Sequence, residues 1–339
     1  MGLPERERPP VRWTAPRYEV DSRGKVLGAT PPRANNWGRF GDEDERGTAN
    51  LITRDSVVQA AGLVRTGQCV SLALPIDPAG PTLPNRPPPL RLNLVTGSDY
   101  LASHEAPGAD AALEWTDDLI VMPLQGSTQW DGLAHIVRDG SLYNGWWSGM
   151  VTASQGATRN GIEHLAESLV GRGVLLDVCA HRGGAPLAAG EAITPDELDA
   201  VAAAERVELR SGDIVLIRTG YLGVLYDTIG DPEAQRAWFC GEPGLTAGCV
   251  EWCQSHDIAA LAVDNYGIEV DPGESGQEKF YPFHQSAIPG LGLTCGEMFW
   301  LDDLAEACAA EGRHEFFLAA QPLRIVNGSG SMLNPIAVL

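Results

Sequence analysis

The segment that decides the fold and the function expected of this chain is residues 124–135, LQGSTQWDGLAH. Its polar side chains stand at even spacing, so they share one face of an extended strand: Gln125, Gln129, Asp131 and His135. Gly126 and Gly132 disfavour a helix and allow a ligand or metal to approach the backbone closely. We therefore expect a strand or glycine-bent loop that presents polar groups to a bound molecule.

A purely structural role is also open, because an Asp-Gly pair suits a turn and buried amides can satisfy backbone groups. The second half of the chain favours a functional role. His284 lies thirteen residues before Glu297, in the stretch FHQSAIPGLGLTCGE. Other landmarks are LLDV at residues 175–178, GDIVLIRTGY at residues 212–221, and a Gly-Ser-Gly turn at residues 328–330.

In their order and spacing, these features of residues 35–339 resemble the cyclase family of metal-dependent hydrolases. Kynurenine formamidase and isatin hydrolase belong to that family. The family motif H-x-x-x-H-x-D-x-x-x-H keeps its spacing here, with Gln125 and Gln129 in place of the first two histidines. The resemblance implies an α/β protein with a kynurenine formamidase-like, swivelling β/β/α fold, in which helices surround a mixed β core.

The resemblance also implies roles for individual residues. The metal-ligand positions fall on Gln125, Gln129, Asp131, His284 and Glu297. His135 takes the position of the catalytic acid or base, beside Asp131. In such enzymes a divalent ion activates water and polarises a carbonyl group, while a histidine moves the proton. The expected reaction is hydrolysis of a small cyclic amide, a lactone or an aryl formamide.

The two glutamines leave open whether a metal ion is bound and which ion it is. A glutamine carbonyl suits Mg²⁺, Ca²⁺ or Mn²⁺ but is a poor substitute for imidazole on zinc. One alternative is a single, weakly held ion, Mn or Zn, with the glutamines as weak or indirect partners. Another is a metal-free acid–base cluster suited to a cyclase or dehydratase of secondary metabolism. A third is a non-catalytic protein that binds a small molecule. We predict the metal-dependent hydrolase.

Aromatic side chains near the motif are expected to enclose an aryl or bicyclic substrate: Trp130, Tyr143, Trp146 and Trp147. His181 follows the LLDV stretch, which is predicted to be a strand. Because α/β proteins place ligands beyond the carboxyl ends of their strands, His181 is expected to line the same pocket, with a surface turn as the alternative.

The composition suits a folded soluble protein, with 44% hydrophobic and 20% charged residues among 339. A formal net charge of −21 repels phosphate backbones and anionic lipids, so neither nucleic acid nor membrane is an expected partner. The start of the chain, MGLPERERPPVRW, lacks the apolar region of a secretory signal, and a cytoplasmic location is predicted. The seven cysteines contain no C-x-x-C and are expected to be reduced thiols.

Residues 1–34, rich in proline and charge, are predicted to form an extended arm before a single catalytic domain, residues 35–339. Because the arm is too poor in apolar residues for a core of its own, we expect it to pack across a subunit surface. A homodimer or a larger even homo-oligomer is predicted.

Alternation of short apolar strands with helices indicates an α/β fold. The helix at 194–205 is signalled by a threonine N-cap and a proline at the first helical position. Helices are also expected at 54–65, 162–170 and within 243–254. Strands are expected at 69–74, 119–123, 173–178, 213–218, 259–263, 323–326 and 336–339.

Overall fold

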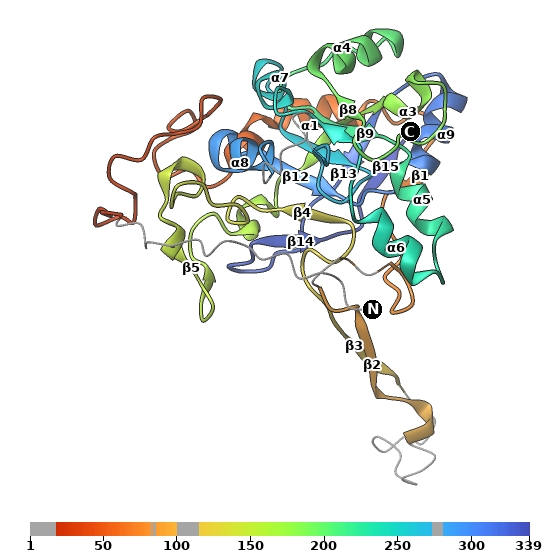
Figure 1. The fold of residues 1–339 in the computed structure, drawn as a ribbon, viewed down its shortest axis with the longest axis horizontal. Coiled ribbons are helices and arrows are strands. Elements are labelled where there is room, and N and C mark those ends of the chain that lie inside the picture. The colour runs from red at the N-terminus through yellow and green to blue at the C-terminus, as the bar shows by residue number, and fades with distance from the viewer. Residues whose placement is uncertain (1–17, 82, 84–85, 100–114, 273–280) are drawn as a thin grey trace, which may run out of the picture.

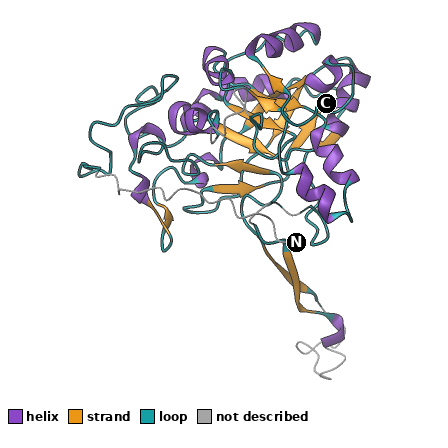
Figure 2. Cartoon of the chain, viewed as in Figure 1, coloured by secondary structure: helices purple, strands orange, loops and turns teal. Residues whose placement is uncertain are grey.

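The structure, a computed structural model, describes residues 18–81, 83, 86–99, 115–272 and 281–339. At its centre is a nine-stranded mixed sheet, around which the helices gather (Figures 1 and 2). In spatial order its strands are β1 (Cys69–Ser71), β15 (Ile336–Val338), β13 (Glu315–Ala319), β7 (Val170–Asp177), β9 (Ile214–Arg218), β11 (Ala260–Val263), β12 (Thr294–Glu297), β4 (Gln129–Asp131) and β14 (Gly330–Met332).

The middle of this sheet, from β7 through β9 and β11 to β12, is parallel, and the outer strands pair antiparallel. Successive residues of the parallel strands point into two separate cores. In β9, for example, Val215 and Ile217 lie in one core, whereas Ile214 and Leu216 lie in the other. Burial of both faces is what a parallel sheet covered by helices requires, and it confirms the predicted α/β class with a mixed sheet.

Helices cover both faces of the sheet. Leu198 of α4 and Val250 of α7 belong to one core, and Leu304 of α9 belongs to the other. Thr194 caps α4 by accepting a hydrogen bond from the backbone N–H of Glu197, as the sequence predicts. The α-helices are α1 (Arg54–Ala61), α3 (Val178–His181), α4 (Pro195–Ala204), α5 (Tyr221–Asp227), α6 (Pro232–Trp238), α7 (Cys249–Ser255), α8 (His284–Ser286) and α9 (Asp302–Glu311).

Two predicted elements are wrong. Residues 162–170 form only a 3₁₀ turn, η4 (Ile162–Leu165), and β7 begins already at Val170. Gly173 lets β13 pack closely against β7, because a Cβ there would lie 2.3 Å from the ring of Phe316. Residues 323–326 are not a strand. The late chain pairs instead through β13 and β14, which sequence patterns did not reveal.

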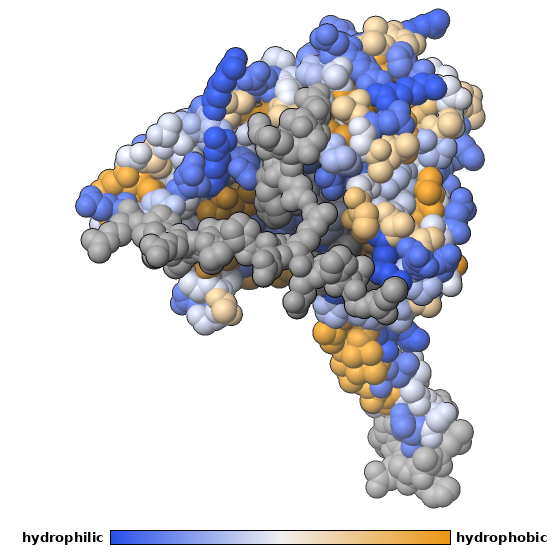
Figure 3. All heavy atoms as spheres, viewed as in Figure 1, coloured by the Kyte–Doolittle hydropathy of each residue, from blue (hydrophilic) through white to orange (hydrophobic). Residues whose placement is uncertain are grey.

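The strand predicted at 119–123 is β3 (Asp117–Val121), and it is largely exposed. It pairs with β2 (Leu90–Val95) in a hairpin that projects from the body (Figure 1). Apolar side chains of the hairpin are exposed, Leu94 by 60% and Val121 by 58%, and they form an apolar surface on the projection (Figure 3). Because the hairpin lies outside the central sheet, its apolar residues are not part of the core.

The remaining elements are short. Residues 18–34 contact the segment after His135, where Lys25 forms a backbone bridge with Trp146.

Among the described residues, no helix is long and apolar enough to cross a membrane. All seven cysteines are free thiols. The short pairs of strands are β5 (Val151–Thr152) with β6 (Gly156–Ala157) and β8 (Ala192–Ile193) with β10 (Gly244–Leu245), and the other short helices are η1 (Gly47–Leu51), η2 (Tyr143–Gly145), η3 (Ser148–Met150) and the π-helix η5 (Ala287–Leu291).

Candidate active site

Strand pairing brings the two halves of the predicted site together. Antiparallel pairing of β4 with β12 sets Gln129 opposite Glu297 and Asp131 opposite Cys295. Because side chains alternate across a strand, Gln129, Asp131 and Glu297 all project from the same face. The strand itself covers only Gln129–Asp131, and Gln125 lies in the bent segment before it, so the motif is part loop and part strand.

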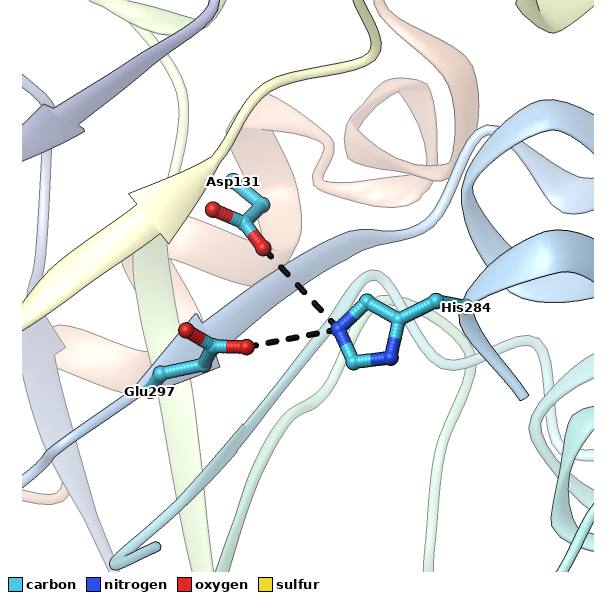
Figure 4. A group of neighbouring side chains, drawn as sticks. All are labelled: Asp131, His284 and Glu297. Atoms are coloured by element: carbon cyan, nitrogen blue, oxygen red, sulfur yellow. Dashed lines mark ion pairs between the residues drawn. The ribbon is translucent and has the colours of Figure 1, made fainter. Parts of the chain in front are cut away.

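A buried cluster of one histidine and two carboxylates forms on this face (Figure 4). His284 enters it from α8, and its Nε2 lies 3.3 Å from Glu297 Oε1 and 3.9 Å from Asp131 Oδ2. The ligand atoms of Asp131, His284 and Glu297 all lie within 4.8 Å of one another, and the three residues are buried. Such a set of one nitrogen and two oxygen atoms can hold a divalent metal ion.

The bonding of Asp131 tests whether the cluster fits an ion. Both carboxylate oxygens of Asp131 are buried, and neither has a hydrogen-bond partner among the described residues. An unpaired buried carboxylate is costly unless a cation or a donor satisfies it. The chemistry of the donors at this point therefore fits a divalent cation held by Asp131, His284 and Glu297.

Glu269 fixes the orientation of His284. Its Oε1 accepts from the imidazole Nδ1 at 2.8 Å, and its carboxylate also accepts the backbone N–H groups of Phe283 and His284. With Nδ1 engaged by a carboxylate, Nε2 is the nitrogen that faces the cluster. Burial disfavours the charged imidazole, but the hydrogen bonds to Glu269 and Glu297 outweigh it and raise the pKa of His284 to about 10.

The two glutamines contact the ionisable residues of the site. The Gln129 amide nitrogen donates to Glu297 Oε2 at 2.6 Å, while its Oε1 is buried without a partner among the described residues. Burial, followed by the charge of Asp131, raises the pKa of Glu297, and His284 opposes that shift. The Gln125 amide nitrogen lies 3.4 Å from Nδ1 of His135 and 3.3 Å from Ser329 Oγ. Gln125 thus lies beside the predicted acid–base residue.

His135 lies at the edge of the cluster, half-buried, with its Nε2 3.7 Å from Asp131 Oδ2. Together with Asp131, His284 and Glu297 it lines a cavity of about 180 Å³. This is smaller than the ~300–1000 Å³ typical of drug-sized ligand sites, so the cavity admits a small molecule. A larger hollow of about 570 Å³ around Arg218 is lined by neither histidine nor cysteine.

The predicted aromatic enclosure is not formed by the expected rings. Trp130 points to the opposite face of β4, where it is fully buried against Phe299, because successive strand residues alternate. Tyr143 and Trp146 are fully buried elsewhere, and Trp147 is 37% exposed. His181 ends α3 on the surface. None of these five side chains is among those that line the cavity.

Residues other than these rings line the cavity instead. Arg86, from the loop before β2, and Tyr266 and Tyr281 complete its walls. Tyr266 lies just beyond the carboxyl end of the parallel strand β11, and residues at such positions commonly contact ligands in α/β proteins. The same signal covers Glu269, three residues further on. Arg86 lies in a proline-rich loop and carries no sequence signal for this role.

Comparisons with known proteins identify the family to which the chain is similar. A family profile described as "Putative cyclase" matches residues 70–270. A solved structure titled as a novel cyclase is 43% identical, with 91% of this chain and 100% of that chain covered and a TM-score of 0.84. A search of curated proteins gives no match.

Isatin hydrolases have the same fold at lower identity. Isatin hydrolase A from Labrenzia aggregata is 20% identical, with 84% of this chain and 97% of that chain covered and a TM-score of 0.55. Its counterpart from Ralstonia solanacearum is 21% identical, with the same coverage and a TM-score of 0.56.

The fold and the site define an α/β enzyme with a buried histidine–carboxylate centre at the junction of two antiparallel strands. More specifically, the chain belongs to the cyclase family, as its sequence motifs predict.

Proposed function

We propose that this protein is a metal-dependent hydrolase of a small cyclic amide, a lactone or an aryl formamide. The observation that carries the proposal is the buried trio Asp131, His284 and Glu297 on the wall of a small cavity, with neither Asp131 oxygen hydrogen-bonded among the described residues. The fold shared with the isatin hydrolases, which are named as hydrolases, adds support.

Asp131, His284 and Glu297 would hold the ion. When bound, a divalent ion supplies Lewis-acid polarisation of a carbonyl and a lowered pKa of bound water. His135 is the group that moves the proton, because its Nε2 is turned toward Asp131 and its ring reaches the cavity. Gln125 orients that ring through Nδ1, and Gln129 holds Glu297 in place.

Metal content and turnover test the proposal together. Protein purified without chelator is expected to contain about one equivalent of Mn or Zn and to hydrolyse a member of a panel of isatin-like lactams, N-formyl arylamines and unsaturated lactones. Asp131→Asn should lose both metal and activity. Asp303→Asn is the matched control, since that carboxylate is exposed on α9 and lines no cavity described above.

Two results would contradict the hydrolase. Full activity of metal-free protein in EDTA would favour a metal-independent cyclase or dehydratase that uses the same cluster. A protein that binds small molecules equally well with His135→Ala, and turns none of them over, would be a binding protein. In either case the family assignment would stand.

A further inference from the structure

Arg86 is the basic side chain of the cavity wall besides the histidines, and it differs from other arginines of the chain. Arg172 and Arg218, for example, are each held by two carboxylates. By contrast, Nη1 of Arg86 is buried and has no hydrogen-bond partner among the residues that the structure describes. A buried N–H of a guanidinium without an acceptor is unfavourable, and an oxygen of a ligand in the cavity would satisfy it.

The surroundings hold Arg86 in the cavity without neutralising it. Its guanidinium lies 6.0 Å from the centroid of the Tyr266 ring, a distance at which a cation is attracted to an aromatic face. Tyr266 itself lines the cavity, as do the carboxylates of Asp131 and Glu297. An anionic ligand in this cavity would therefore have Arg86 as its counter-ion.

We propose that Arg86 binds a carboxylate of the substrate, so that the hydrolysed amide, lactone or formamide is an anionic compound. A guanidinium presents parallel N–H groups that match the two oxygens of a planar carboxylate. The small cavity favours such a compact monoanion over a bulky polyanion. This inference rests on the proposed hydrolase for the identity of the substrate, but the anion site itself can be tested without turnover.

The first experiment measures binding of benzoate and of benzamide, a planar pair of nearly equal size that differs in charge. Calorimetry uses the full chain stripped of metal by EDTA, so that benzoate cannot bind through an ion. Wild type is expected to prefer benzoate, and Arg86→Gln should weaken benzoate roughly tenfold to a hundredfold while leaving benzamide unchanged. Arg86→Lys, which keeps the charge but loses the planar fork, should fall between them.

Arg91→Gln is the matched control, because Arg91 lies on the exposed hairpin and contacts Asp118 rather than the cavity. Thermal unfolding checks that each variant is folded. Equal loss of benzoate and benzamide binding in Arg86→Gln, or loss of neither, would overturn the proposal.

The second experiment separates a substrate carboxylate from the carboxylate that hydrolysis of a lactam or lactone generates. A compound of the panel's classes that carries a ring carboxylate is compared with its analogue in which that carboxylate is replaced by a carboxamide. Arg86→Gln should raise KM for the carboxylate compound at least tenfold, with little change in kcat and none for the analogue. If only product inhibition weakens, Arg86 binds the product and the substrate assignment is wrong. Absence of turnover with both compounds refutes the hydrolase, whereas the benzoate measurement still decides the role of Arg86.

Discussion

The contacts of Glu269 make a direct test of how the site is held together, and we predict that Glu269→Gln loosens it. Glu269 and His284 are each 4% exposed, and the carboxylate accepts three N–H groups, from His284 Nδ1 and from two backbone amides. A glutamine has one acceptor oxygen where glutamate has two. Its NH₂ group would therefore face at least one of these buried donors.

The magnitude follows from that single mismatch. An unsatisfied buried donor costs about 1–3 kcal/mol, which lowers the melting temperature by roughly 1–4 °C for a protein of 339 residues. A misoriented ligand histidine should also weaken Mn²⁺ or Zn²⁺ binding about tenfold to a hundredfold. Isothermal calorimetry measures the affinity, and circular dichroism measures the melting temperature.

Glu311→Gln is the control, since Glu311 is exposed at the end of α9 and should change neither quantity. The reasoning is refuted if Glu269→Gln binds the metal as tightly as wild type while Asp131→Asn does not bind it. That result would mean that packing alone, without the Glu269 hydrogen bonds, sets the orientation of His284.

Three further predictions concern stability, packing and assembly. Burial raises the pKa of Glu205 to about 8, so the folded protein favours the neutral form and loses stability as pH rises from about 4.5 toward 8. Glu205→Gln should therefore have the same free energy of unfolding as wild type below pH ~4.5. At pH 8 its free energy of unfolding, measured by urea titration, should exceed that of wild type by roughly 1–2 kcal/mol. An equal difference at both pH values would contradict this. Gly296→Ala places a Cβ 2.6 Å from the ring of Trp130. We therefore expect the free energy of unfolding to fall by about 1–3 kcal/mol, and the activity to fall because the neighbouring Glu297 is displaced. An active variant with an unchanged melting temperature would exclude strain at this position. The homo-oligomer predicted from residues 1–34 is checked by light scattering, where a mass near 36.2 kDa at micromolar concentration would show a monomer.

Sequence patterns predicted those parts of the fold whose cause is local. The threonine cap and first-turn proline mark α4 because they satisfy or remove unpaired N–H groups at a helix start. The apolar runs that became β7, β9 and β11 are recognisable because a strand buried on both faces needs apolar residues throughout. The motif around Asp131 and the distant His284 and Glu297 likewise keep a spacing that identified the family.

The tertiary structure alone decided which residues share the cavity. Alternation of side chains along β4 places Trp130 and Asp131 on opposite faces of the strand. Only the residues packed against each face determine that the Trp130 face belongs to the core and the Asp131 face to the site. Arg86 lines the cavity, and Glu269 holds the cavity residue His284, through long-range packing that no local period encodes. The sequence by itself determined the family and the α/β class, and it pointed to Asp131, His135, His284 and Glu297, which line one cavity. The contacts of Gln129 with Glu297 and of Glu269 with His284 depend on strand register and on chain folding between distant segments, and only the three-dimensional structure specifies those.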